Sequence, residues 1–463
     1  MYGTIIINES IQNSISLLES YKNKMSDYGN LYVFVRNEFD NSGDITLDFL
    51  DVIAAANKFG YIYINTIVVP TEDINKSDLP DNILYIVWLA KNNNHFFNKD
   101  MIRESHIWKN VEWGKRSKNY NPKGKDPGNV WIPTKDDGKA NITEHILLSL
   151  SDIINRIYSC SAQNGFENIY ITSKSINNLT ISPNIIVKQT NYSNTKKYSK
   201  RKIYKKVTNT PIDHLSGSIV WDTSENLDKI PDESINVVIT SPPYWDLKDY
   251  FKKGQIGQES YQTYLDRLYT VWQGCYKKLC NNGSLWLNIN IRKKNGNVIL
   301  IPKDFVEQCR KIGFHYKGIL IWHKSSGIPT NNKNIVDRHE YVLIFSKSKD
   351  LNINKRIFDF SDYKNEKING GLIWNINRKA GSIGKHFIHP AIYPNELVTR
   401  IVQITTNPND TVLDPFLGSG TTLIASVLEN RNCIGYEYNE GFKDLIMSRI
   451  KNEISKKTFS LRI

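Results

Sequence analysis

The chain of 463 residues is poor in cysteine and has no long apolar run. Its five cysteines show none of the spacings typical of zinc or redox motifs, and their odd number argues against a disulfide framework. No stretch approaches the roughly 20 apolar residues that a membrane-spanning helix needs. The start, MYGTIIINES, lacks the basic segment and apolar core of a secretion signal. We therefore expect buried thiols in a reducing cytoplasm, no membrane association and no metal site.

The composition otherwise suits a folded protein of several domains. Apolar residues make up 40% and aromatic residues 11%, which excludes a wholly disordered chain. A length of this order corresponds to about two to four domains. The 60 Lys and Arg exceed the 47 Asp and Glu, giving a formal net charge of +13. That surplus is compatible with a polyanionic partner, but charge alone does not identify one.

A basic stretch and an internal repeat suggest how the chain is divided. Residues 191–206, NYSNTKKYSKRKIYKK, carry no acidic side chain and are typical of an exposed linker or of a strip that contacts nucleic acid. They separate 1–190 from 207–463. Five short segments of the first part recur in the second in the same order: 31–34 with 285–288, 48–50 with 304–306, 60–61 with 313–314, 81–85 with 337–341 and 128–131 with 371–374. We interpret 1–190 as a diverged copy of much of 207–463; two unrelated α/β segments are the alternative.

Strands and helices are expected to alternate in the second part. Apolar β-rich runs predict strands at 235–240, 284–289, 319–323, 341–346, 411–416 and 432–438. Helical spacing predicts helices at 260–279, 301–313, 397–405 and 421–430. Such alternation favours a mostly parallel sheet with both faces covered, which binds ligands at the C-terminal ends of its strands.

A glycine loop follows the strand that begins at residue 411. It reads Asp-Pro-Phe-Leu-Gly-Ser-Gly-Thr-Thr over 414–422 and runs into a helix. The glycines allow a sharp turn and a close approach of a ligand, and no Gly-Lys-Ser/Thr of a phosphate-binding loop is present. Glu437 ends the next strand, where an acidic residue can accept both ribose hydroxyls of a nucleoside. The pattern predicts a site for a nucleoside cofactor without a phosphate requirement.

A second motif, Ser241-Pro242-Pro243-Tyr244, ends the strand 235–240. The prolines stiffen the backbone and remove two N–H donors, so the tip presents carbonyl acceptors and the Ser241 hydroxyl. These can accept the two N–H groups of an exocyclic amine, whose lone pair would then be freer to attack, and Tyr244 offers a plane for stacking. Positioning and desolvation would supply most of the rate gain.

In this order, the two motifs resemble those of the S-adenosylmethionine-dependent amino-group DNA methyltransferases, in particular the β group, over about 215–463. The resemblance implies a doubly wound, mostly parallel, seven-stranded α/β sheet of the class I methyltransferase type. It implies catalytic residues Ser241, Pro242, Pro243 and Tyr244. Residues implied for the binding of S-adenosyl-L-methionine are Asp222, Pro394, Asp414, Phe416, Gly418, Gly420, Thr421, Thr422 and Glu437.

The activity implied is site-specific methylation of double-stranded DNA on a base turned out of the duplex. A Ser tip tends to accompany the N4 of cytosine, and the N6 of adenine is the runner-up. Methylation of RNA or of a protein glutamine amide, and a catalytically inactive DNA-binding protein, are more distant alternatives. The family further implies a prokaryotic or phage modification role beside a restriction endonuclease, without direct contact, in a monomer or homodimer.

The first part, 1–190, has neither motif, which predicts a catalytically inactive methyltransferase-like domain that contacts DNA or supports the fold. Its stretch 106–131 is basic and aromatic and suits phosphate contact with stacking. Within 207–463, the polar loops of about 323–388 are candidates for target recognition. His339-Glu340 suggests acid–base or metal chemistry, but no third ligand stands at a useful spacing. Candidate DNA contacts in these loops are Lys324, Arg338, His339, Lys347, Arg378 and Lys385.

Overall fold

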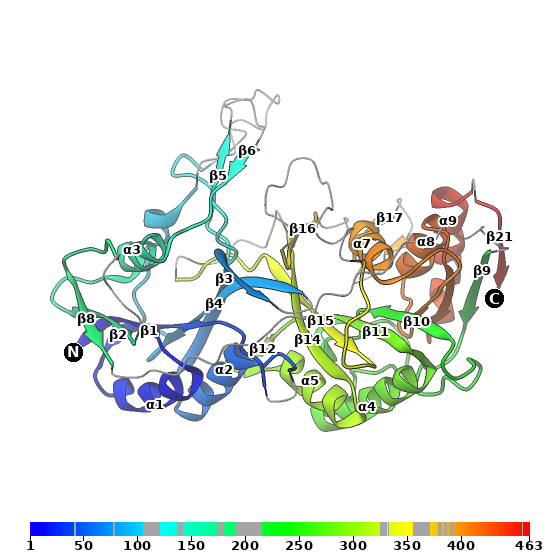
Figure 1. Ribbon diagram of the computed structural model, residues 1–463, viewed down its shortest axis with the longest axis horizontal. Coiled ribbons are helices and arrows are strands. Elements are labelled where there is room, and N and C mark those ends of the chain that lie inside the picture. The colour runs from blue at the N-terminus through cyan, green and yellow to red at the C-terminus, as the bar shows by residue number, and fades with distance from the viewer. Residues whose placement is uncertain are drawn as a thin grey trace. The chain divides into compact units, whose positions relative to one another are not determined.

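The computed structural model describes residues 1–40, 43–76, 79–104, 121–136, 142–173, 179–190, 215–324, 331, 333–354, 371–377, 382–383, 387–388, 393–455 and 457–463. The chain divides into two compact units (Figure 1). The first unit takes residues 1–200, 326–339 and 362–372, and the second takes 201–325, 340–361 and 373–463. Each unit is built on its own main sheet. No helix in the described ranges is long and apolar enough to cross a membrane.

The second unit contains a nine-stranded sheet in its described part. The order across the sheet is β16 (Ile373–Asn375), β14 (His315–His323), β15 (His339–Ser346), β11 (Leu279–Ile289), β10 (Ile235–Thr240), β19 (Thr411–Asp414), β20 (Asn432–Tyr436), β9 (Leu215–Val220) and β21 (Phe459–Arg462). Every pair from β11 to β21 is parallel, whereas β15 runs antiparallel to β11. The expected mostly parallel sheet is therefore present. It has one short edge strand more on each side than the seven strands predicted, β16 and β21.

Helices cover both faces of this sheet (Figure 1). One face carries α4 (Tyr261–Lys278) and α5 (Ile301–Ile312), and the other carries α7 (Asn395–Thr405), α8 (Thr421–Leu428) and α9 (Lys443–Glu453). The apolar side chains of α4 fall at helical spacing, so that Tyr264, Leu268, Val271 and Trp272 are buried together. Helix α5 has a proline in its first turn and ends at Gly313, whose φ of 117° allows the left-handed cap. These helices agree with the sequence prediction to within a few residues.

The first unit holds a six-stranded sheet in its described part. The order is β3 (Ile62–Lys76), β4 (Pro80–Ala90), β2 (Met25–Val35), β1 (Tyr2–Asn8), β7 (Glu167–Thr172) and β8 (Ile185–Gln189). Its helices are α1 (Ile11–Lys22), α2 (Asp48–Lys58) and α3 (Leu150–Ser161). Short hairpins and turns complete the two units: β5 (Thr134–Asp136) with β6 (Ile142–His145), β12 (Arg292–Lys294) with β13 (Asn297–Ile299), β17 (Ser382–Ile383) with β18 (Phe387–Ile388), η1 (Lys99–Ile102), η3 (Trp245–Leu247) and η4 (Glu440–Phe442).

The two sheets share a strand order and pairing pattern. The order β3-β4-β2-β1-β7-β8 corresponds position by position to β14-β15-β11-β10-β19-β20. In each sheet the third strand is antiparallel to the second and parallel to the fourth, and the next two pairs are parallel. The repeated segments fit this correspondence. Val130, the third residue of the repeat 128–131, bridges Val68 of β3 in parallel. Ile373, the third residue of the matching repeat 371–374, pairs in parallel with Ile321 of β14.

A segment of the second half of the sequence belongs to the first unit. Gly128 forms a parallel bridge with Val336, and the backbone N–H of Arg338 donates to the side chain of Asn129 over 2.8 Å. Asn129 in turn donates to Asp337 over 3.0 Å. These bonds explain why 326–339, which the sequence analysis assigned to the target-recognition loops of the second domain, clusters with the first unit.

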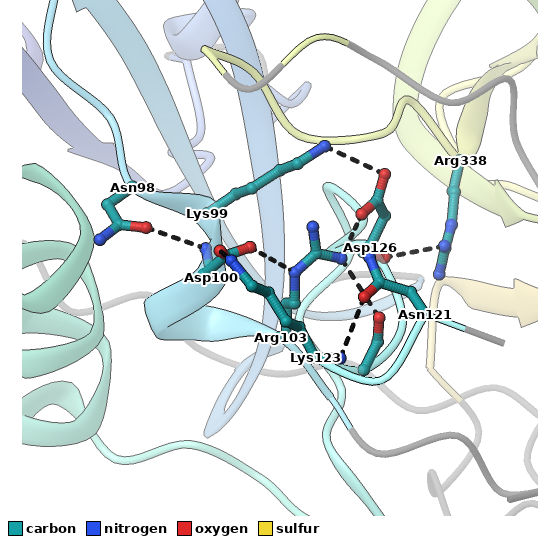
Figure 2. A network of polar contacts seen from close by, with 9 residues as sticks. Asn98, Lys99, Asp100, Arg103, Asn121, Lys123, Asp126 and Arg338 are labelled. Carbon is teal, nitrogen blue, oxygen red and sulfur yellow. Dashed lines mark hydrogen bonds and ion pairs between the residues drawn. The ribbon is translucent and has the colours of Figure 1, made fainter.

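Arg338 also reaches a network of charged side chains inside the first unit (Figure 2). Its guanidinium donates to the backbone carbonyl of Asp126 over 3.0 Å. The Asp126 carboxylate accepts from Lys99 over 3.1 Å and from Arg103, and Arg103 also pairs with Asp100. Lys99 and Arg103 are almost fully buried, so Asp126 supplies the counter-charge that their burial requires. The basic stretch 191–206 and residues 106–120 of the basic aromatic stretch 106–131 lie outside the described residues.

Candidate active site

The two predicted motifs lie at the same edge of the second sheet. The tip 241–244 follows β10, and the glycine loop 415–420 follows β19, the parallel neighbour of β10. Glu437 follows β20 and Asp222 follows β9, the next two strands along. A cavity opens at these strand ends. It lies where parallel α/β sheets bind their ligands.

Six of the predicted site residues line this cavity, and the other seven do not. Those in the lining are Asp222, Ser241, Pro243, Phe416, Gly418 and Glu437. Tyr250, Tyr393, Arg267 and Lys252 line it as well. The predicted residues outside the lining are Pro242, Tyr244, Pro394, Asp414, Gly420, Thr421 and Thr422. They adjoin lining residues in the chain or hold them by hydrogen bonds.

The Ser-Pro-Pro-Tyr tip is fixed by its own neighbours. The hydroxyl of Tyr264, on α4, donates to the carbonyl of Pro243 over 2.7 Å, and the hydroxyl of Tyr244 donates to Glu340 Oε2 over 2.7 Å. Burial, together with the charge of Glu340, holds the pKa of Tyr244 well above its ordinary value, so this phenol keeps its proton. Within the described part of the chain the Pro242 carbonyl has no hydrogen-bond partner. It remains available as an acceptor beside the Ser241 hydroxyl.

The glycine loop needs backbone conformations that glycine adopts without strain. Gly418 and Gly420 have φ angles of 53° and 82°. A Cβ at Gly420 would also stand 3.1 Å from Ile446 Cγ2 on α9. The backbone N–H of Gly418 donates to Glu437 Oε2 over 2.8 Å. Burial raises the pKa of Glu437 to about 7, although hydrogen bonds from the N–H groups of Asn439 and Gly418 counteract that effect.

Asp414 lies behind the loop, fully buried, and makes no wall of the cavity. Its carboxylate accepts from the hydroxyls of Thr240 and Thr422, both at 2.6 Å, and from the hydroxyl of Tyr393 and the N–H of Phe416, both at 3.0 Å. Burial raises its pKa, and these four donors oppose the rise. Asp414 therefore ties the end of β10 to the glycine loop and to the start of α8.

Comparison with known proteins matches this half of the chain to one family. The family model N6_N4_Mtase, described as DNA methylase, matches residues 235–448. The Type II methyltransferase M.Cfr9I of Citrobacter freundii is 30% identical over 277 residues, which are 52% of this chain and 89% of that protein. The chain belongs to the amino-group DNA methyltransferases.

Other members of the amino-methyltransferase family differ in the base that their names specify. The DNA adenine methyltransferase YhdJ of Escherichia coli is 28% identical over 249 residues, 50% of this chain and 80% of that protein. Among solved structures, PvuII DNA methyltransferase (cytosine-N4-specific) is 22% identical with a TM-score of 0.42, covering 56% of this chain and 99% of that one. Each of these two matches covers about half of this chain.

Sequence reasoning missed several residues that hold the methyltransferase site together. Arg449 on α9 is fully buried beneath the glycine loop. Its guanidinium donates to the Ser419 carbonyl and the Thr421 hydroxyl, both at 2.8 Å, and to Asn395 at 2.9 Å. Because Asn395 starts α7 directly after Pro394, Arg449 joins three of the segments that surround the cavity. An arginine on an otherwise charged C-terminal helix gives no sequence signal of such burial.

The basic residues proposed for DNA contact are engaged within the protein where the structure describes them. Lys324 is 3% exposed and pairs with Glu340, while Arg338 and His339 are buried in or beside the first unit's network. Lys347 donates to the Leu279 carbonyl over 2.7 Å. Their predicted role as exposed DNA contacts is not supported, because each has a protein partner or is buried. Arg378 and Lys385 lie outside the described residues.

The matching edge of the first sheet has a different chemistry. By strand register, Asn8-Glu9-Ser10-Ile11 stands where the second unit has its Ser-Pro-Pro-Tyr tip. Ser10 caps α1 by accepting the N–H of Asn13, so the chain enters that helix without a proline-stiffened tip. Asn8 donates to the Tyr170 hydroxyl over 2.8 Å. Residues 173 and 179–184, the described part of the connection after β7, contain no helix in the position of α8.

Proposed function

We propose that this DNA methyltransferase transfers the methyl group of S-adenosylmethionine to the exocyclic N4 of cytosine in a base turned out of the duplex. The observation that carries the proposal is the shared cavity, which Ser241 lines from the end of β10 and Gly418 from the end of β19. An amine-binding tip and a nucleoside-binding loop thus face the same space. If the two motifs had only a structural role, there would be no reason for them to line the same cavity.

The cavity residues suit S-adenosylmethionine, which supplies an electrophilic methyl group on a positively charged sulfur. Glu437, when ionised, would accept the ribose hydroxyls, and the glycine loop would lie against the nucleoside because Gly418 has no side chain. Asp222 lines the same cavity with its side chain 47% exposed, which leaves its carboxylate accessible to the adenine end. The glycine loop would be held in place by three residues that are buried and hydrogen-bonded to it, Asp414, Thr421 and Thr422.

The tip would hold the base amine by its two N–H groups. Ser241 Oγ and the Pro242 carbonyl are the acceptors, and the two prolines keep them in place. Hydrogen bonds from both N–H groups favour a pyramidal nitrogen and localise its lone pair. The ring of Tyr244 would stack on the base and fix the orientation of its plane. The residues would contribute mainly by orienting the amine and excluding water.

The uncharged Ser241 supports cytosine as the target base. An aspartate at this position would add a charged acceptor, and in the family that residue tends to accompany adenine N6. Both amines present the same pair of N–H groups, so adenine N6 is the alternative to test.

The first unit is proposed to be a diverged, catalytically inactive copy that holds DNA or supports the second unit. Its strand order and pairing directions match those of the second unit, which supports a common origin. The absence of a proline-stiffened tip after β1 supports the loss of catalysis. The site-specific methylation itself is therefore assigned to the second unit.

Base-resolution mapping of methylation in DNA from cells that express the full chain tests this function. Digestion to nucleosides and mass spectrometry should show N4-methylcytosine, which is absent when Tyr244→Ala is expressed at the same level. N6-methyladenine in its place would overturn the base assignment. No methylated base above the Tyr244→Ala background would overturn the proposed activity.

A further inference from the structure

A buried ion pair supports the catalytic tip through residues that do not line the cavity. Glu340, the second residue of β15, accepts the Tyr244 hydroxyl at Oε2 over 2.7 Å and the Asn288 amide over 2.8 Å. Its other oxygen, Oε1, accepts the ammonium of Lys324 over 2.8 Å. We call Asn288, Lys324 and Glu340 the tip-support cluster. None of its members lines the cavity, and all have low exposure.

The carboxylate of Glu340 is ionised. Burial by itself would raise its pKa, but the charge of Lys324 and the hydrogen bonds from Tyr244 and Asn288 bring the pKa below its ordinary value. The pKa of Tyr244 is raised, so the proton between them stays on the phenol. An ionised carboxylate only accepts hydrogen bonds, which fixes Tyr244 as the donor and turns the NH2 end of Asn288 toward the tip.

Asn288 extends this support to the catalytic serine. Its Nδ2 stands 2.9 Å from the Tyr244 hydroxyl and 3.4 Å from Ser241 Oγ. Asn288 is 6% exposed, and its Oδ1 has no hydrogen-bond partner among the described residues. The orientation of the Asn288 amide is therefore set by the hydrogen bonds that its nitrogen donates. Glu340 imposes this orientation, because its carboxylate can only accept.

The first unit offers an internal comparison without the tip. The register of β2 with β4 matches that of β11 with β15, so Phe34 takes the place of Asn288 and Leu84 that of Glu340. Both are 2% exposed and pack in one apolar cluster. The fold thus closes this position with apolar side chains, which is often as stable as a buried ion pair or more so. The charged pair is found in the unit that carries Ser-Pro-Pro-Tyr.

We propose that Glu340, neutralised by Lys324, is a positioning residue for methyl transfer, acting through the Tyr244 hydroxyl and the Asn288 amide. Its carboxylate sets the plane on which the target base stacks and the direction of the N–H groups beside Ser241. Because Glu340 lies outside the cavity lining, it acts on the base through these two side chains. The inference rests on the proposed methyltransferase activity.

Glu340→Gln tests the role of the charge while keeping the size of the side chain. In single-turnover assays on the mapped recognition sequence, the methylation rate should fall by about 10- to 100-fold, the range expected from misplacing reacting groups. The dissociation constant for S-adenosylmethionine, measured by calorimetry, should stay within twofold of wild type, about the error of such a comparison. A wild-type rate in Glu340→Gln would overturn the proposal. An inactive wild-type protein would instead overturn the proposed function.

A double-mutant cycle separates action through Tyr244 from an independent effect. Tyr244→Phe removes the hydroxyl that Glu340 binds, and should slow the reaction by a similar factor. Combining it with Glu340→Gln should slow the reaction no further than the slower single variant, because the two changes break one interaction. Losses that multiply in the double variant would show that Glu340 does not act through the tyrosine, and would overturn the proposal.

Leu84, the counterpart of Glu340 in the first unit, suggests a control for folding. Lys324→Met combined with Glu340→Leu removes both charges together, so that no buried charge is left unpaired. This variant should melt at or above the wild-type temperature yet keep the slow single-turnover rate. Recovery of the wild-type rate would mean that the pair serves stability alone, and would overturn the proposal.

Discussion

Glu437 Oε2 accepts the backbone N–H of Gly418 over 2.8 Å, so the end of β20 holds the loop that follows its neighbour β19. Glu437 Oε1 accepts the N–H of Asn439 over 2.7 Å. The carboxylate thus binds the backbone of two residues that line the cavity, Gly418 and Asn439. Its burial raises its pKa to about 7, into the range where a modest change of pH alters its charge.

Binding of S-adenosylmethionine should depend on pH through Glu437. Ribose hydroxyls donate to the ionised carboxylate, and the free protein loses that form as pH falls through about 7. The dissociation constant should therefore rise by about tenfold for each pH unit below this pKa and level off above it. Calorimetric titration across the neutral range measures the curve. Glu437→Gln should bind more weakly and show a flat profile; the same slope in that variant would contradict the assignment.

Gly420→Ala should impair the loop by more than its backbone strain. A left-handed φ costs an alanine about 1–2 kcal/mol, and the added Cβ would press on Ile446 as well. Gly296 is the matched control, because its φ of 80° is nearly that of Gly420 and no atom lies within 4 Å of its added Cβ. Denaturant unfolding should show the larger loss for Gly420→Ala, with weaker cofactor binding in that variant alone. Equal losses and equal affinities would argue against close packing at the loop.

Asp414→Asn should loosen the connection between β10 and the glycine loop. An amide would direct N–H groups at hydroxyls that now donate to the carboxylate, so buried hydrogen bonds would be lost. We expect a loss of about 2–4 kcal/mol in unfolding free energy, the range for leaving buried partners unpaired. Asp444, exposed in the first turn of α9, is the control, and its Asn variant should melt close to wild type. A wild-type melting temperature for Asp414→Asn would contradict this role.

Asp126→Asn should destabilise the first unit. The change leaves Lys99 and Arg103 buried without their shared counter-charge (Figure 2). Because the Asp126 side chain is 25% exposed, we expect a loss of about 2 kcal/mol, below the usual range for a fully buried pair. Asp100→Asn, at a more exposed member of the network, should cost less. Equal melting temperatures for Asp126→Asn and wild type would contradict the network's importance.

The same carboxylate should make the first unit sensitive to acid. Burial opposes ionisation of Asp126, but Lys99 and Arg103 hold its pKa below the ordinary value. Its contribution is therefore present above the unfolded pKa, about 4, and is lost as pH falls through the lower folded pKa. The stability difference between wild type and Asp126→Asn should shrink in acid. A difference that stays constant down to acidic pH would contradict this account.

The sequence predicted the candidate site best where a recognisable motif directly follows a predicted strand. The run at 235–240 ended by two prolines, and the strand leading into Gly418 and Gly420, identified the two walls of the cavity. The sequence did not predict contacts between residues that lie far apart in the chain. In the sequence, Arg449 looks like any surface arginine of a helix, because its contact with the glycine loop forms only in the folded chain. The role of Glu340 likewise depends on the pairing of β15 with β11. Likewise, nothing local in 333–339 indicates that Asn129 binds it.

The inclusion of residues 326–339 in the first unit has a consequence for synthesis on the ribosome. The chain emerges from its N-terminus, so the strands of the first sheet leave the exit tunnel long before Val336 and Arg338 are made. Gly128 and Asn129 must wait for these partners while β9, β10, β11 and β14 emerge. The unit that begins first is thus completed late: a nascent chain halted before residue 340 would carry Val336 and Arg338 but would still lack residues 362–372 of the first unit.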